Sequence, residues 1–247
     1  MSGRGIVAAL AAALAALSAA GPALGQAYQC RLPERIAPVP PVRPDGPVRR
    51  VPIAGFTLAV SWSPEYCRQD RDPGSLQCSG RAGQFGFVLH GLWPESASGP
   101  PPQWCALTPR PRPETIRDGL CATPVPWLIE HEWAKHGSCM AQSPEAYWGI
   151  ARQIWQRFVW PDADALSRRP GLTVGDLREA LLLANANPRA GLRREAIGVL
   201  VGHTGQGGGG WLRELRICHN RAYRPVACDP AQFGPPDSAP LKIWRGL

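Results

Sequence analysis

Three of the five histidines in this chain lie in two short segments, FVLHGLWPE (residues 87–95) and EHEWAKHGSC (residues 130–139). The second segment also holds Glu132 and Lys135, and Lys135 is one of only two lysines in a sequence that otherwise uses arginine. Acid–base chemistry on an anionic substrate needs a cluster of titratable groups of this kind. The two segments therefore predict a catalytic site and the elements that carry it.

An α-helix is predicted for the second segment. Neither proline nor glycine occurs over residues 127–136, so a helix can run through this stretch and end near Gly137. Two pairs of polar residues are spaced i,i+4 along it, Glu132 with His136 and His131 with Lys135. Because the two stripes are adjacent, the four polar groups share one broad face of the helix.

A zinc-binding helix is the main alternative for these histidines. Such a helix carries H-E-x-x-H, with its two histidines at i,i+4. Here His131 and His136 are spaced i,i+5, which turns the second away from the first. We therefore expect neither a metal ion nor another cofactor. His203 and His219 lie outside the cluster, and each is expected to have a structural role.

Both segments resemble the two active-site signatures of the ribonuclease T2 family, in a bacterial form. The first signature has the core H-G-L-W-P, and the second has the core H-E-W-x-K-H-G-x-C. A third stretch, LAVSWSPEYC at residues 58–67, is similar to the early strand of this family that ends in a cysteine. The order of these landmarks extends the resemblance over residues 55–230.

The resemblance implies an exported endoribonuclease that cleaves single-stranded RNA without a metal ion. The 2′-hydroxyl is an internal nucleophile, so the enzyme needs a base, an acid and cations for the phosphorane charge. The products would pass through a 2′,3′-cyclic phosphate to 3′-phosphate ends, with little base specificity. His90 and His136 are the implied acid–base pair, with His136 favoured as base but the order left open. Lys135 would stabilise the phosphorane, Glu132 would assist, and His131 would hold the phosphate.

Base recognition is less well defined by the sequence. Trp93 could offer a stacking face to a base, or it could simply pack in the core, and both interpretations stay open. Glu95 falls where members of the family often carry an acidic or amide group that contacts the base. We therefore treat Trp93 and Glu95 as candidate substrate-binding residues.

Two functions from other classes compete with this interpretation. A catalytically silent protein on the same fold would use its basic surface to bind RNA or a partner, and a metal-dependent hydrolase would lose activity to a chelator. The net charge of +8 suits a polyanion such as RNA but decides nothing by itself. We expect RNA as the substrate, a monomer, no obligate protein partner and no membrane association.

The arrangement of strands and helices predicts an α+β fold. Alternating or buried apolar runs predict strands over residues 56–62, 85–91 and 211–219, and helical spacing predicts helices over residues 127–136, 143–159 and 173–186. The last helix begins with a Thr173–Asp176 pair that resembles a capping box. Strands and helices do not alternate regularly, which favours α+β. The resemblance implies an antiparallel sheet with packed helices, held by disulfides.

The N-terminus predicts a secretory signal peptide over residues 1–27, because a positive start, an apolar run and small residues follow one another. Residues 28–53 are rich in proline and arginine and predict an extended arm. The catalytic domain is expected over residues 54–230, followed by a C-terminal tail over residues 231–247. This organisation places the mature protein in a periplasm or outside the cell.

Eight cysteines follow the predicted signal peptide, and none forms C-x-x-C. In an oxidising compartment they are expected to form disulfides, although the sequence alone leaves their connectivity open. The resemblance implies the pairs Cys67–Cys78, Cys105–Cys139 and Cys218–Cys228, and it leaves Cys30–Cys121 as the fourth. The Cys105–Cys139 bridge would tie the region after the first signature to the end of the second.

Overall fold

The computed structural model describes residues 27–28, 30–69, 73–107, 109–187, 190–203 and 210–245. The predicted signal peptide lies outside these residues, except for its last position. Within the described part of the chain, no helix combines the length and the apolar character needed to cross a bilayer.

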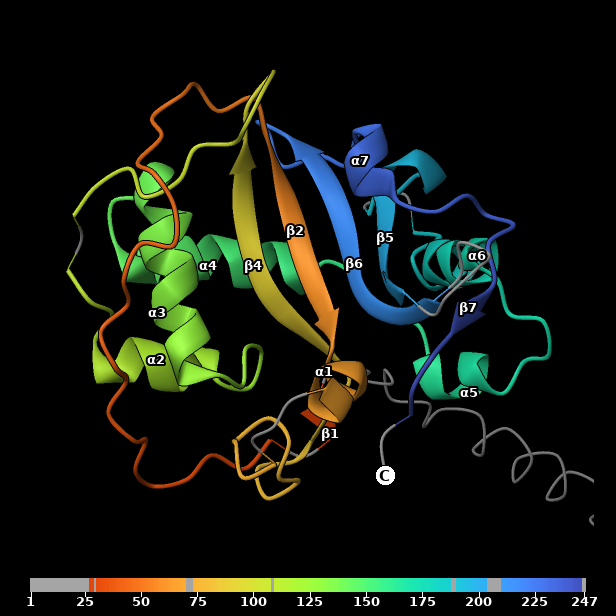
Figure 1. Cartoon of the computed structure of the whole chain (residues 1–247), viewed down its shortest axis with the longest axis horizontal. Coiled ribbons are helices and arrows are strands. Elements are labelled where there is room, and N and C mark those ends of the chain that lie inside the picture. Colours follow the sequence, from red (N-terminus) through yellow and green to blue (C-terminus); the bar gives the residue numbers. More distant parts are fainter. Residues whose placement is uncertain are drawn as a thin grey trace, which may run out of the picture.

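The described strands form an antiparallel sheet with one parallel addition (Figure 1). Its order is β4 (Phe87–Glu95), β2 (Gly55–Trp62), β6 (Gly210–Asn220) and β5 (Ile197–His203), with β7 (Leu241–Lys242) pairing parallel to β6. A second small sheet pairs β1 (Ala27–Tyr28) with β3 (Gln84–Phe85). The predicted α+β fold is thus confirmed, and β6 is an inner strand of the sheet.

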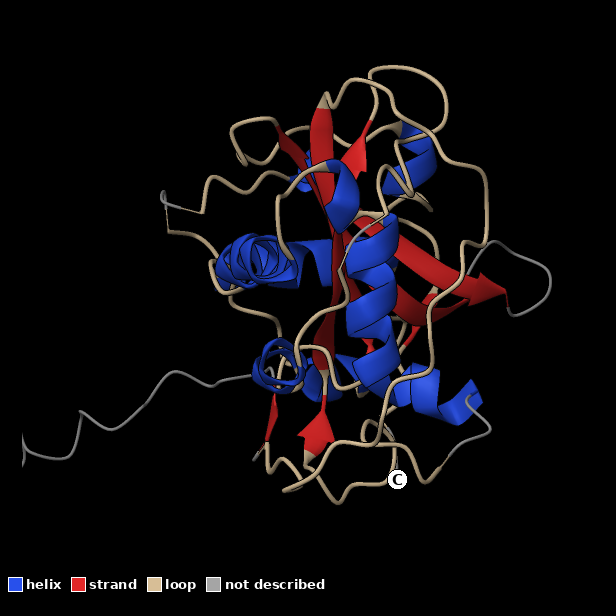
Figure 2. Cartoon of the chain, turned by 90° about the vertical axis from the view of Figure 1, so that its left-hand side faces the viewer, coloured by secondary structure: helices blue, strands red, loops and turns tan. Residues whose placement is uncertain are grey.

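Helices lie against both faces of the sheet and beside its edge (Figure 1). They are α1 (Ser63–Gln69), α2 (Pro113–Gly119), α3 (Pro126–Lys135), α4 (Pro144–Trp155), α5 (Ala163–Ser167), α6 (Val174–Ala184) and α7 (Pro230–Phe233), with short 3-10 turns at Gly137–Cys139 and Arg194–Ala196. Helix α4 passes behind β4 and β2, whereas α3 stands beside the edge strand β4 (Figures 1 and 2). On the face opposite α4, in front of the sheet in Figure 1, α7 covers one end, where Gln232 donates to Thr57 and Glu95, and the rest of this face carries polar side chains.

Side-chain alternation separates the two faces of the sheet. On β2, Leu58 and Val60 are fully buried in the main core, and Leu215 and Ile217 of β6 join them there. The side chains between them on both strands point to the other face. Burial of these apolar groups stabilises the fold at about 25 cal/mol per Å². The same alternation leaves one face of β2, β4 and β6 free to carry a polar site.

The predicted elements are found with modest changes in their ends. Helix α4 begins after the Ser143 cap, whose hydroxyl accepts from the Ala146 N–H, but it ends at Trp155 rather than at residue 159. The capping box of α6 is present between Thr173 and Asp176. Strand β4 continues to residue 95 through Pro94, which an edge strand tolerates because its outer N–H groups need no partner.

The cysteines pair as the resemblance implied. All eight lie in described parts of the chain and form the disulfides Cys30–Cys121, Cys67–Cys78, Cys105–Cys139 and Cys218–Cys228. Residues 30–54 run without helix or strand along the domain, apart from one backbone bridge between Arg49 and Gln103. At the other end, Leu241 and Ile243 are buried in the main core, so the C-terminal segment packs with the domain.

Candidate active site

A β-bulge in β4 brings His90 onto the polar face of the sheet. Ala59 of β2 pairs with Gly91, and Val60 pairs with Leu89, so His90 is the extra residue with no Cα partner on β2. Leu89 faces the core and is fully buried, whereas the His90 side chain is 29% exposed. Bulges of this kind re-aim one side chain beside an active site. Here the bulge lets Leu89 and Leu92, three residues apart, both face the core, with His90 as the extra residue between them on the polar face.

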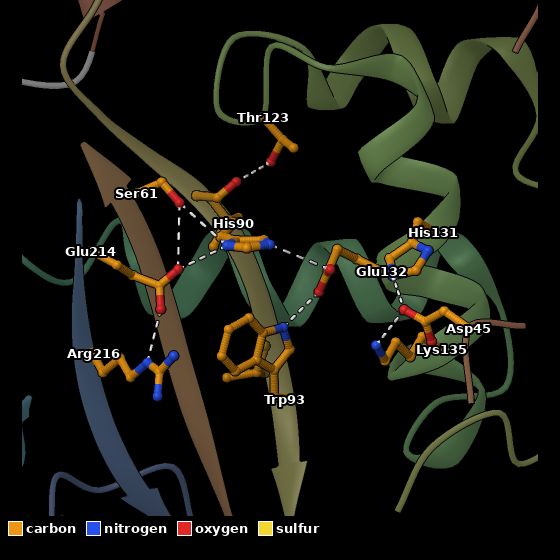
Figure 3. Close-up of polar contacts among 12 residues, drawn as sticks. Asp45, Ser61, His90, Trp93, Thr123, His131, Glu132, Lys135, Glu214 and Arg216 are labelled. Atoms are coloured by element: carbon orange, nitrogen blue, oxygen red, sulfur yellow. Dashed lines mark hydrogen bonds and ion pairs between the residues drawn. The ribbon is translucent and has the colours of Figure 1, made fainter. Parts of the chain in front are cut away.

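Acidic groups surround the His90 imidazole (Figure 3). Its Nδ1 lies 2.8 Å from Glu214 Oε2 and 3.2 Å from Ser61 Oγ, and its Nε2 lies 3.6 Å from Glu132 Oε1. Burial lowers the pKa of His90, but the hydrogen bond to Glu214 and the two carboxylate charges outweigh it, so the net shift is upward. The environment therefore favours a protonated His90.

Glu214 is prepared for this role by its own contacts. Burial raises its pKa, but the hydrogen bond and charge of His90 and the charge of Arg216 outweigh burial, and the net shift is downward. The Arg216 Nε donates to Glu214 Oε1 at 2.8 Å. Because Glu214 stays ionised, it can orient His90 through Nδ1 and leave Nε2 for substrate. Glu214, Arg216 and Ser61 were not singled out in the sequence.

Glu132 of α3 closes the other side of His90. The carboxyl is buried, and the Trp93 indole Nε1 donates to its Oε2 at 2.6 Å. Burial raises the pKa of Glu132 to about 6, although the charge of His90 and the Trp93 bond oppose the shift. A Cβ on Gly91 would lie 2.3 Å from Glu132 Oε2, so any other residue here would force the Glu132 carboxyl to shift. The G of the first signature thus has a steric cause.

Trp93 lies between the two histidines of the predicted acid–base pair. Its ring centroid is 5.2 Å from that of His90, at an interplanar angle of 80°, and 5.5 Å from that of His136, at 31°. The Arg216 guanidinium lies 5.3 Å from the same ring. Trp93 is half-buried, and its N–H is used by Glu132. The indole therefore separates the two imidazoles and binds the Glu132 carboxyl, a set of contacts that neither of the two predicted roles included.

His136 occupies the opposite electrostatic environment. It caps the end of α3, is buried, and its Nδ1 has no hydrogen-bond partner among the described residues. An imidazolium carries N–H on both nitrogens, so this site disfavours the charged form. Burial, with the charges of Lys135, His131 and His90 adding to it, lowers the pKa of His136 to about 3. His136 is therefore neutral across the physiological range.

The second stripe of α3 faces the N-terminal arm. His131 stacks on Trp127, with ring centroids 4.7 Å apart. Burial and the charge of Lys135 lower the pKa of His131, and the charge of Asp45 opposes them. The Lys135 Nζ lies 2.8 Å from Asp45 Oδ2, and His131 Nε2 lies 3.8 Å from the same oxygen. As predicted, the i,i+4 pairs form adjacent stripes, one toward β4 and one toward the arm.

Glu95 lies two residues beyond Trp93 on the same face of β4. Its Oε1 accepts from Thr57 Oγ1 at 2.7 Å and from Gln232 Nε2 at 2.7 Å. Burial raises the pKa of Glu95, although both hydrogen bonds oppose the shift. The structure thus gathers His90, Glu132 and His136 around Trp93, and it places His131 and Lys135 on the adjacent stripe beside Asp45. Glu95 lies at the neighbouring end of the strand.

No metal centre is evident in the part of the chain that the structure describes. None of its groups of His, Cys, Asp or Glu side chains has three or more members arranged to hold a metal ion. The titratable groups gathered here are two histidines in contrasting environments, a lysine, and buried carboxylates. This set can move protons and stabilise negative charge on a phosphorus centre.

Comparison with known proteins identifies the family. The model of the ribonuclease T2 family matches residues 54–168. A ribonuclease of Aeromonas hydrophila is 33% identical over 177 residues, which cover 67% of this chain and 71% of the relative. Ribonuclease I of Escherichia coli K12 is 28% identical over 147 residues, and the match covers 44% of this chain and 55% of that protein.

Solved structures share the fold at lower sequence identity. The self-incompatibility-associated SF11-RNase of Nicotiana alata has a TM-score of 0.57 at 17% identity, covering 78% of this chain and all of that chain. RNase NT in complex with 5′-AMP has a TM-score of 0.58 at 18% identity, covering 78% of this chain and 99% of that chain. On the combined evidence of sequence and fold, the chain belongs to the ribonuclease T2 family.

Proposed function

We propose that this RNA-cleaving endoribonuclease cuts single-stranded RNA by metal-independent transesterification, through a 2′,3′-cyclic phosphate to 3′-phosphate ends and with little base preference. One observation carries the proposal. Two imidazoles flank the same indole, and their surroundings shift their pKa values in opposite directions. Such a divergence is the pattern that separates a general acid from a general base.

The divergence supports one order of proton transfer, which the sequence left open. His136 is neutral and takes the proton from the 2′-hydroxyl as it attacks phosphorus. His90 is protonated beside Glu214 and gives its proton to the departing 5′-oxygen. In the second step the roles reverse, because water attacks the cyclic phosphate and the 2′-oxygen leaves. Acid–base catalysis of this type contributes about 10²–10⁴-fold in rate.

The remaining side chains act on the phosphate. Lys135 stabilises the charge that builds on the phosphorane, and His131 beside it holds the phosphate group. Glu132, with a pKa of about 6, exists in both protonation states near neutrality. It can orient His90 as a carboxylate or share a proton with a phosphoryl oxygen as an acid. Trp93 and Glu95 line the face of β4 where a base would lie.

Product analysis on defined ribodinucleotides in EDTA tests the proposal. Cyclic phosphate should appear first and 3′-phosphate later, as followed by ³¹P NMR and chromatography. The matching deoxydinucleotides should survive, because they lack the 2′-hydroxyl. Cleavage that needs a divalent metal, appreciable DNA cleavage, or a rate no higher than that of His136→Ala would each refute it.

We also propose that the protein is exported and acts as a monomer. The disulfides support an oxidising compartment, and the apolar N-terminal run supports a cleaved signal peptide. N-terminal sequencing of protein from a periplasmic or culture fraction should start near residue 28. Light scattering should give the mass of one chain. Reduction with thiol should inactivate the enzyme.

A further inference from the structure

An acidic side chain from the N-terminal arm enters the catalytic cluster. Asp45 precedes the region, residues 54–168, that the family model matches. A single oxygen of its carboxylate, Oδ2, lies 2.8 Å from Lys135 Nζ and 3.8 Å from His131 Nε2 (Figure 3). Lys135 and His131 are the two groups assigned above to the substrate phosphate. One anionic oxygen of the protein itself thus lies where both of them converge.

The arm holds this carboxylate in place. The Trp104 indole donates to the other oxygen, Oδ1, at 3.1 Å. Two residues after Asp45, the Pro47 carbonyl accepts from Gln103 Nε2 at 2.9 Å. Arg49 then pairs with Gln103 through two backbone hydrogen bonds of 2.9 and 3.0 Å. Asp45 is therefore positioned by contacts on its own side chain and on the chain that follows it.

The charge of Asp45 persists in this position. The hydrogen bond from Lys135 holds the pKa of the carboxyl below its ordinary value. The side chain is also 49% exposed, and an ion pair this accessible contributes little to stability. A carboxylate oxygen and a non-bridging phosphate oxygen accept the same charge-assisted hydrogen bonds. Asp45 and the RNA phosphate therefore compete for the same donors.

We propose that Asp45 is a resident anion that competes with the RNA phosphate for Lys135 and His131 and so weakens the binding of substrate and of phosphate-bearing products. The inference rests on the phosphate role proposed for these two residues. Because Asp45 is displaced in both the substrate complex and the transition state, its competition weakens both equally and leaves the rate of the chemical step unchanged. Asp45 thus sets KM and product release, not proton transfer.

The variant Asp45→Asn tests the competition, because it keeps the shape and removes the charge. Inorganic phosphate should bind about two- to five-fold tighter by calorimetry, as expected for an exposed ion pair. KM for a ribodinucleotide should fall by a similar factor, with kcat not reduced. The matched control is Glu34→Gln, which removes another exposed carboxylate from the same arm away from the site. Its phosphate affinity should equal that of the wild type.

Phosphate binding can be read without turnover, from the ring protons of His131 in an NMR titration. If the wild-type protein cleaved no RNA while Asp45→Asn still bound phosphate tighter than the wild type, the proposed function would be refuted and this inference kept. Unchanged or weaker phosphate binding in a folded Asp45→Asn protein would overturn the inference and leave the ribonuclease intact. If that variant does not fold, Asp45→Ser takes its place under the same criteria.

Discussion

His90 and His136 flank the same indole, but the charges closest to each histidine have opposite signs. In the sheet region (β2, β4 and β6), His90 lies beside Glu214 of β6 and is also approached by Glu132 from α3. In the helix region (the end of α3), His136 is surrounded by Lys135 and other cations. The pKa of His90 is therefore raised and that of His136 is lowered. In the proposed mechanism, the residue type makes proton transfer possible and the surrounding charges separate the acid from the base.

The two regions also differ in how they are assembled. His90 meets Glu214 across 124 residues of sequence, through the register of β4, β2 and β6. The helix region is local, because its titratable groups lie within one turn and a half of α3. It is held from outside by the Cys105–Cys139 bridge and by a backbone hydrogen bond from Trp104 to Lys135. Substitutions can therefore disturb one region and leave the other.

Removing either histidine should give the largest effect. His90→Ala and His136→Ala should each lower kcat by about 10²–10⁴-fold on a ribodinucleotide. The two variants should differ in rate on a uridine 3′-phosphodiester with a p-nitrophenyl leaving group, because this group leaves as an anion and needs no proton from the acid. His90→Ala should regain most of its rate on this substrate, because only the general acid is missing. His136→Ala should stay slow, because the base is still needed.

The same comparison can fail in a defined way. If the activated substrate restores His136→Ala and not His90→Ala, the assignment of acid and base is reversed. Equal rescue of both would mean that neither histidine acts only as acid or base in the first step. Circular dichroism and melting temperature on each variant show whether a loss of rate comes from unfolding.

The contact between the two regions should be the next most sensitive point. Gly91→Ala places a Cβ 2.3 Å from Glu132 Oε2 and 2.9 Å from Trp93 Nε1, so the Trp93–Glu132 bond must shift. A displacement of about 1 Å can cost about 10²-fold in rate. Gly149→Ala is the matched control, since nothing lies within 4 Å of its added Cβ. Steady-state kinetics should show a fall in kcat for Gly91→Ala alone; wild-type kcat would contradict the steric argument.

The sequence predicted the helix region better than the sheet region. Periodicity placed Glu132, His136, His131 and Lys135 on one helix, because i,i+4 spacing is a local property. Glu214 escaped notice, although its strand was predicted. Alternation predicts which face of the sheet a side chain lies on, but the register and the bulge decide which side chains it contacts on the neighbouring strands. Both features depend on how the strands pair with β2, and this pairing cannot be read from the sequence of one strand.

Asp45 was missed for a different reason. It lies in an arm without periodic structure, where spacing carries no information about contacts. Its position follows from tertiary hydrogen bonds to Trp104 and from the pairing of Arg49 with Gln103. The end of α4 shows the same limit, since apolar residues continue to 159 but the helix stops at Trp155. Tertiary packing, rather than local pattern, sets these features.

The charge on the sheet region can be tested through the pH profile. The base must be neutral, so activity is lost as pH falls through the His136 pKa of about 3. The acid must be protonated, so activity is lost as pH rises through the His90 pKa, which lies above its ordinary value. Glu214→Gln removes an opposing charge, so the alkaline limb should move to lower pH. At neutral pH, kcat/KM should fall about tenfold, since hydrogen bonds to charged groups contribute about 1.5–3 kcal/mol.

The acid limb should not move in the same variant, because Glu214 does not contact His136. Glu95→Gln removes a second half-buried carboxylate from the same sheet face without touching His90. Its alkaline limb should stay at the wild-type pH, whatever happens to KM. An alkaline limb that is unchanged in Glu214→Gln would show that Glu214 does not control the protonation of His90.

The smallest effect should come from replacing Ser61, whose neutral hydroxyl contacts His90 Nδ1, the nitrogen that also contacts Glu214. Its Oγ lies 3.2 Å from His90 Nδ1 and 3.5 Å from Glu214 Oε2, so it is the weaker of the two partners of that nitrogen. Ser61→Ala should lower kcat about two- to five-fold, as a neutral hydrogen bond contributes about 0.5–1.5 kcal/mol. The alkaline limb should barely move, because no charge is lost. If Ser61→Ala lowered activity as much as Glu214→Gln, the orientation of the His90 ring, rather than the charge beside it, would make His90 the acid. The difference between the two histidine regions would then be one of geometry and not of charge.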